Sequence, residues 1–224
     1  MQSRWPVLYW KQLGELCTPE ERANLDTAVE EVIDTLRRNP WKHSVAVSGS
    51  GEYEHYANEA RQLGKEIALA GRDLLSGGLG GIMFHSTRGF LEARRGGTAV
   101  GIIPGDAEKA KKAKVLASNL PGAKQVFTSL SGPGHKGPTS RNNVLISVAS
   151  RVVLMPGSVG SKAEVELAVR CYRKPVIAFD PGGNDDNYRD WRACIKELSI
   201  PVIDSLSEAF QDWLHFTIEP LLGS

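Results

Sequence analysis

The sequence has few cysteines, and their placement excludes two kinds of structure. Its three cysteines, Cys17, Cys171 and Cys194, lie far apart, without a CxxC pair and without a histidine at metal-ligand spacing. This pattern argues against a disulfide framework and against a zinc site, and it fits a reducing compartment. We therefore expect a cytoplasmic protein with no metal site.

Net charge and long apolar runs are also lacking. The 27 Lys and Arg residues are balanced by 26 Asp and Glu residues, which leaves a formal net charge of +1. Such a chain has no general electrostatic attraction to nucleic acid or to a membrane. No apolar run approaches the ~20 residues of a membrane span, and the N-terminus lacks the layout of a signal peptide. We expect a small-molecule ligand, with no nucleic-acid and no membrane partner.

The length of 224 residues favours one α/β domain with a terminal extension. We expect residues 1–42 to form a helical extension and residues 43–224 to form a nucleotide- or phosphate-binding domain. In the extension, Thr18, Pro19 and Glu21 have the spacing of a capping box, and the helix should continue to about Arg38. Its apolar stripe is expected to cover an edge of the sheet or a subunit interface. Together with the apolar central helices, it predicts a homodimer or homotetramer.

Short apolar runs alternate with helix-forming segments over the rest of the chain. This alternation predicts a Rossmann-like, doubly wound α/β fold, with a mostly parallel sheet of about six strands and helices on both faces. Runs rich in β-branched residues are typical of strands buried on both faces. The candidate strands are residues 44–47, 73–76, 98–103, 152–155, 174–179 and 201–203, with 123–128 as a weaker candidate.

Three glycine-rich turns follow strands of this sheet. Such turns bare backbone N–H groups at helix N-termini, where a phosphate is favoured, although they also occur only to let a helix fold back on its strand. The first turn does not have the GxGxxG spacing of a dinucleotide site, which argues against NAD. The candidate ligand- and phosphate-binding residues are Ser48, Gly49, Gly78, Gly80, Gly81, Met83, Gly157, Ser158, Val159, Gly160 and Ser161.

The third turn carries a motif. Residues 156–164 read PGSVGSKAE, which resembles the PGGxGTxxE motif of the superfamily that includes the Lonely Guy cytokinin-activating phosphoribohydrolases and the molybdenum cofactor carrier proteins. Serine replaces the second glycine at Ser158 and the threonine at Ser161. In the hydrolases an arginine on the preceding helix acts with the motif glutamate, and Arg141 stands at the matching place, 164 − 141 = 23 residues before Glu164.

The resemblance covers roughly residues 44–204, and some details favour its carrier branch. These are the stretches GGLGGIM and GIIPG and the pair Arg141-Asn142, where the hydrolases have Arg-Lys. The resemblance implies nothing about the residues before Trp41. The resemblance implies a protein that holds the molybdenum cofactor, a phosphorylated pterin, through backbone donors and Arg141.

The alternative is a hydrolase that releases the base and ribose 5-phosphate from a nucleoside 5′-monophosphate and needs no cofactor. In that case Arg141 and Glu164 are the catalytic residues: Glu164 would stabilise a cationic transition state or activate water, while Arg141 would hold phosphate or ribose oxygens. Glu166 should point about 200° around the helix from Glu164, away from the site. A nucleotide-signal sensor, or an ordinary ion pair between Arg141 and Glu164, stays open as well.

Overall fold

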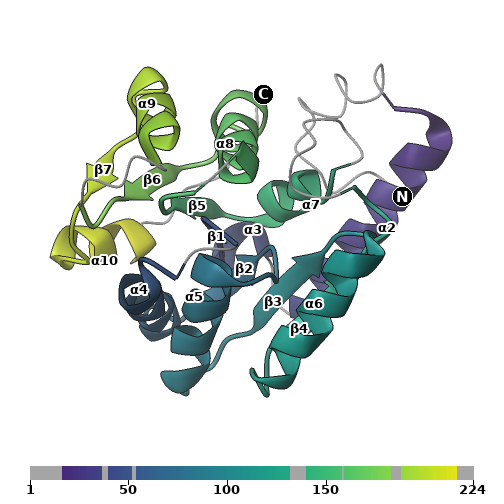
Figure 1. Ribbon diagram of the computed structural model, residues 1–224, viewed down its shortest axis with the longest axis horizontal. Coiled ribbons are helices and arrows are strands. Elements are labelled where there is room, and N and C mark those ends of the chain that lie inside the picture. The colour runs from purple at the N-terminus through teal and green to yellow at the C-terminus, as the bar shows by residue number, and fades with distance from the viewer. Residues whose placement is uncertain are drawn as a thin grey trace.

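The fold is a parallel sheet with helices on both faces (Figure 1). The computed structural model describes residues 17–36, 40–51, 54–131, 140–157, 159–182 and 188–215. Within them the sheet has seven strands in the order β4-β3-β2-β1-β5-β6-β7. They are β1 (Ser44–Ser48), β2 (Asp73–Ser76), β3 (Ala99–Ile103), β4 (Lys124–Phe127), β5 (Arg151–Leu154), β6 (Val176–Phe179) and β7 (Val202–Ile203).

The doubly wound Rossmann-like class is confirmed, with one strand more than expected. Every pairing between neighbouring strands is parallel. The weaker candidate segment forms β4, a full member of the sheet at its edge. Because β4 is largely exposed on this edge, its sequence lacks the continuous apolar run that marks the central strands.

Helices cover the two faces of the sheet and bury two apolar cores. They are α2 (Pro19–Leu36), α3 (Pro40–His43), α4 (Ala57–Leu69), α5 (Gly81–Glu92), α6 (Ala107–Ser118), α7 (Arg141–Val148), α8 (Val159–Glu166), the π-helical turn η1 (Leu167–Cys171), α9 (Arg189–Glu197) and α10 (Glu208–His215). One core joins α2, α7, α8 and α9, and the other joins α4, α5 and α10. Successive residues of β1 alternate between them, since Ala46 belongs to the first core and Val45 and Val47 to the second.

Helix α2 begins with the predicted capping box. The Glu21 N–H donates to Thr18 Oγ1 at 3.2 Å, and the Thr18 N–H donates to Glu21 Oε2 at 2.8 Å. The apolar stripe, which includes Val29 and Val32, is buried in the core shared with α7 and lies against β3 and β4. The stripe therefore covers the sheet edge within the chain, and it no longer supports a subunit interface.

The predicted N-terminal extension, residues 1–42, lies partly outside the described residues. Residues 1–16, which precede the capping box, are outside them. The division of the chain at residue 42 stays a prediction, although α2 shares its core with the sheet. No helix in the described parts of the chain is both long enough and apolar enough to cross a bilayer.

Candidate functional site

The site lies where the order of the strands reverses. The chain builds the sheet from β1 outward to β4 and then crosses to β5 on the other side of β1. In open parallel sheets this switch point, at the carboxyl ends of the strands, is where ligands bind. The turns after β1 and β5 are joined there, since the Met155 N–H donates to the Ser48 carbonyl at 2.8 Å and the Ser50 N–H donates to the Pro156 carbonyl at 3.1 Å.

Arg141 and Glu164 meet at this edge. Arg141 Nη1 donates to Glu164 Oε1 at 3.1 Å, and the hydroxyl of Ser48 donates to the other carboxylate oxygen, Oε2. Arg141 is 1% exposed and Glu164 4%. The structure therefore brings together the two residues selected from the motif and fixes the carboxylate through both of its oxygens.

The helix boundaries explain why these side chains converge. Ser140 is the N-cap of α7, and its side chain accepts from the Asn142 N–H at 3.3 Å, so that Arg141 is the first helical residue. Glu164 lies on α8, which follows β5, and Ser48 is the last residue of β1. All three positions are at the same end of the sheet because its strands are parallel.

Burial and pairing act on the protonation of this cluster in opposite directions. Burial raises the pKa of the Glu164 carboxyl, while the Arg141 guanidinium and the Ser48 hydroxyl favour the carboxylate and offset part of that rise. Burial likewise lowers the pKa of Arg141, and Glu164 opposes the change. The pair is thus a buried salt bridge, which is strongly destabilising to break, and not an exposed ion pair of ~1 kcal/mol or less.

Gly77 makes room for the arginine. A Cβ atom at Gly77 would lie 2.3 Å from Arg141 Nη2 and 2.7 Å from its Cζ, so a larger residue would push the guanidinium away. Arg141 Nε is buried and, among the described residues, has no hydrogen-bond partner. A buried donor without a partner is unusual, and a ligand that binds Arg141 can supply the acceptor.

The glycines of the first two turns pack against other parts of the chain. A Cβ at Gly49 would lie 2.6 Å from Ile82 Cγ2, and one at Gly80 would lie 2.8 Å from the Gly51 carbonyl oxygen. Gly81 has a φ of +55°, a conformation that favours glycine, and begins α5. These glycines let α5 approach the turn after β1, whatever role they have toward a ligand.

The third turn is only partly described. A Cβ at Gly157 would lie 2.1 Å from Ser161 Oγ, so Gly157 lets the side chain of Ser161 fold over the turn. Val159 and Gly160 form the start of α8. Ser158 lies outside the described residues. The contact of a phosphate with this turn stays a prediction.

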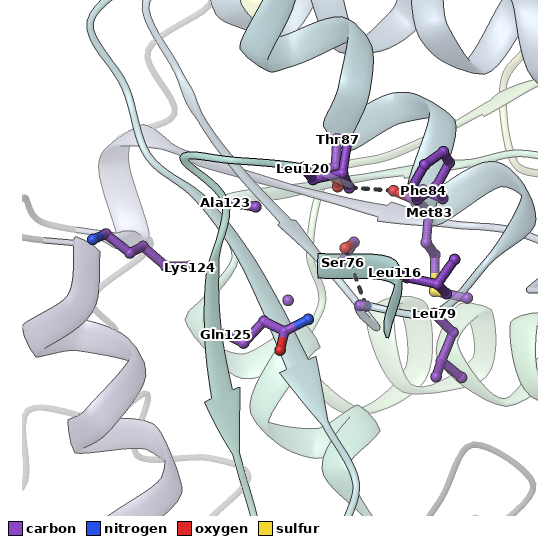
Figure 2. Close-up of a pocket in the computed structure, with 12 residues that line it drawn as sticks. Ser76, Leu79, Met83, Phe84, Thr87, Leu116, Leu120, Ala123, Lys124 and Gln125 are labelled. Atoms are coloured by element: carbon purple, nitrogen blue, oxygen red, sulfur yellow. Dashed lines mark hydrogen bonds between the residues drawn. The ribbon is translucent and has the colours of Figure 1, made fainter. Parts of the chain in front are cut away.

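Gly78 and Met83 line a small pocket, and Arg141 and Glu164 are not among its lining residues. Figure 2 shows Met83 beside Leu79 and Leu116 in this pocket. Its walls are mainly apolar and come from β2, β3, α5, α6 and the start of β4. Its volume of about 20 Å³ holds roughly a water molecule and is far below the ~300 Å³ or more of ligand pockets. This pocket alone therefore does not accommodate a nucleotide.

Two features of the site were missed from sequence. Ser48 was selected to bind ligand, but its hydroxyl is bound to Glu164. Gly77 was not selected, although it carries the closest approach to Arg141. Both contacts depend on β1 lying between β2 and β5, which spacing along the chain does not show. Glu166, in contrast, is only partly buried and is absent from the Arg141 cluster, as its position on the helix predicts.

In Rossmann-like proteins small ligands bind at the switch point of the parallel sheet, which is where the buried pair of Arg141 and Glu164 lies. Residues 42–201 match the SLOG cluster4 family. The match spans more than half of the chain, and the protein belongs to this family. A comparison with curated proteins gave no significant match.

Several solved structures are similar to the chain. The molybdenum cofactor carrier protein of Chlamydomonas reinhardtii is 26% identical, with a TM-score of 0.54, over 75% of this chain and 94% of that one. The structural genomics target TM1055 is 27% identical over 60% of this chain and 72% of that one, with a TM-score of 0.48. DNA processing protein A from Helicobacter pylori, which binds single-stranded DNA, is 15% identical over 82% of both chains, with a TM-score of 0.59.

The family match and the likeness to the carrier protein support the predicted superfamily at a coarse level. The carrier protein shares both sequence and fold with the chain, whereas the DNA processing protein shares the fold alone at its lower identity. Assignment to the carrier branch stays a prediction. The expectation that nucleic acid is not a partner has no support from these neighbours.

Proposed function

We propose that this protein binds a phosphorylated, nucleotide-like small molecule at the switch point between β1 and β5, as a molybdenum cofactor carrier-like protein. The observation that carries the proposal is the buried Arg141, whose Nε–H has no partner among the described residues. An arginine buried beside helix N-termini is suited to an anion, since its hydrogen bonds to phosphate are charge-assisted. The likeness to the carrier protein of Chlamydomonas reinhardtii supports the choice of ligand.

The residues present fit the anionic end of such a cofactor. Arg141 can hold its phosphate, and the Ser161 hydroxyl and the first N–H groups of α8 lie beside the turn that follows β5. The described residues contain no group of three or more His, Cys, Asp or Glu side chains that could hold a metal ion. Arg141 and the start of α8 would hold the cofactor by its phosphate. The bound cofactor would supply its molybdenum centre as cargo.

The second candidate is a phosphoribohydrolase, and the placement of Glu164 favours it. Its carboxylate is buried and fixed through both oxygens, so little reorganisation is needed for it to face a positive charge. Such preorganisation is what stabilises a cationic transition state at the ribose. The same cluster of Arg141, Glu164 and Ser48 thus serves either a carrier or a hydrolase.

Binding and turnover measured side by side test the proposal. The protein is titrated calorimetrically with nucleoside 5′-monophosphates and with molybdenum cofactor, and released base is followed by chromatography. We expect binding without base release; base release that falls by orders of magnitude in Glu164→Gln but not in Glu166→Gln would establish the hydrolase instead. If none of these ligands binds, the proposed function is wrong.

A further inference from the structure

We propose that the site binds its anionic ligand together with one proton, which Glu164 accepts when the ligand takes over Arg141. The inference rests on the proposed function, since it concerns the same site. It adds a coupling to pH that neither the family nor the related structures indicate. The proton comes from water or buffer, whose bond to that proton breaks as the new Glu164 O–H bond forms, and no other covalent bond forms or breaks.

The geometry leaves Glu164 dependent on a single positive charge. From α7 it receives the Arg141 guanidinium, and from β1 the uncharged Ser48 hydroxyl. The turn after β2 contributes the backbone of Gly77, which packs against the arginine. Among the described residues, no other charged group acts on the Glu164 carboxylate. The cluster therefore holds one positive and one negative charge, which balance.

An incoming phosphate upsets this balance. It either displaces the carboxylate from Arg141 or shares the guanidinium with it, and in both cases a second negative charge enters a site screened little by water. Two anionic groups within hydrogen-bond distance of one cation repel each other, and protonation of one of them relieves the repulsion. Glu164 takes up the proton because it loses its only positively charged partner among the described residues, whereas the phosphate gains the Arg141 guanidinium and keeps at least its first negative charge near neutral pH.

The Ser48 hydroxyl can provide a hydrogen-bond partner for protonated Glu164. In the structure this hydroxyl donates to the carboxylate. A hydroxyl can also accept, so after rotation it can take a hydrogen bond from the new carboxylic O–H. The protonated side chain is then not left buried without a partner, and no other residue has to move to accommodate the proton.

The sign of the pH dependence follows. Burial raises the pKa of Glu164, and its pairing with Arg141 offsets part of that rise. Once the ligand occupies Arg141, the offset is lost and the pKa of Glu164 rises further. Between these two pKa values binding takes up one proton, so the affinity falls tenfold for each unit of rising pH, and outside that window the affinity does not respond to Glu164.

Calorimetry with adenosine 5′-monophosphate and with inorganic phosphate tests this coupling. Each is titrated between pH 6 and 9 in pairs of phosphate-free buffers that differ in ionisation enthalpy, which gives the number of protons taken up. We expect up to about one proton more per site in the wild type and in Glu166→Gln than in Glu164→Gln. A proton taken up by the probe itself, whose second phosphate pKa is ~6, would not give the carbonyl band of a protonated buried carboxyl, so infrared difference spectra of the wild type show which group holds the proton.

The outcomes separate the two proposals. Binding with equal proton uptake in the wild type and in Glu164→Gln would overturn the coupling and leave the proposed function standing. If neither probe binds at any pH, the coupling is wrong; the proposed function is wrong as well only if molybdenum cofactor does not bind either. If Glu164→Gln does not fold, infrared difference spectra of the wild type decide: the carbonyl band of a protonated buried carboxyl must appear when the probe is added.

Discussion

Replacing Arg141 by methionine gives the sharpest prediction about stability. Arg141→Met leaves the Glu164 carboxylate at 4% exposure with only the Ser48 hydroxyl as a described partner. Breaking a buried pair on one side costs ~3–5 kcal/mol. The loss is limited because Glu164 can take up a proton, and protonating a carboxyl of normal pKa ~4.3 at pH 7 costs roughly 3 to 4 kcal/mol. We therefore expect a loss of about 3 kcal/mol at pH 7.

Because Glu164 can take up a proton, the loss of stability in Arg141→Met depends on pH. In Arg141→Met the folded pKa of Glu164 lies far above its unfolded value of ~4.3, so the folded state binds the extra proton and its stability rises as the pH falls towards that value. The penalty should shrink by about 1.4 kcal/mol for each unit, so that little of it remains at pH 5. Urea unfolding followed by circular dichroism at pH 5 and pH 7 measures this directly.

The double variant Arg141→Met/Glu164→Gln is the control. It removes both charges, so it should be clearly more stable at pH 7 than Arg141→Met alone and should show little of the pH dependence. The reasoning is refuted if Arg141→Met loses less than about 1 kcal/mol at pH 7 or loses the same amount at both pH values. Either result would mean that Glu164 is not a buried carboxylate that depends on the charge of Arg141.

Three further predictions concern stability away from the site. In Gly64→Ala the new Cβ would lie 1.9 Å from a backbone carbonyl oxygen of α5, so we expect a loss of about 3 kcal/mol or more in urea unfolding, while Gly96→Ala, which meets nothing within 4 Å, should be nearly neutral. Burial lowers the pKa of Lys174 to about 8 in the folded state, so between this pH and the normal lysine pKa of ~10.4 the unfolded state binds more protons than the folded state. The free energy of unfolding should therefore rise by roughly 3 kcal/mol between pH 8 and 10.5 in the wild type, and this rise should be absent in Lys174→Met. Thr18→Ala removes the N-cap bond of α2 and should lower the thermal midpoint by the equivalent of about 1 kcal/mol.

Much of the fold could be predicted from local pattern. Apolar runs located the central strands, and the spacing of Thr18 and Glu21 located the start of α2, because both signals depend on neighbours in the sequence. The edge strand β4 was harder to recognise, since an edge needs fewer apolar residues. The apolar stripe of α2 could be recognised, but its partner could not: the stripe covers the sheet within the chain, where sequence alone allowed another subunit.

Some residues of the site could also be found from the sequence, and others could not. Arg141 and Glu164 were found from a motif and its spacing, and the structure joins them across 23 residues. The roles of Ser48 and Gly77 were not found, because each belongs to a different strand that reaches the pair only in the folded sheet. The many glycines of the turns indicated that another group comes close to the backbone there, but the sequence could not show whether that group belongs to a ligand or to the chain itself.

The central claim is that Arg141 is the anchor for the anionic group of a ligand at the switch point of the sheet. A crystal structure of the protein with bound adenosine 5′-monophosphate tests it most directly. The phosphate is expected within hydrogen-bond distance of the Arg141 guanidinium and beside residues 157–161, with the bond between Arg141 and Glu164 lengthened or broken. A phosphate bound elsewhere, with the pair between Arg141 and Glu164 unchanged, would contradict the claim.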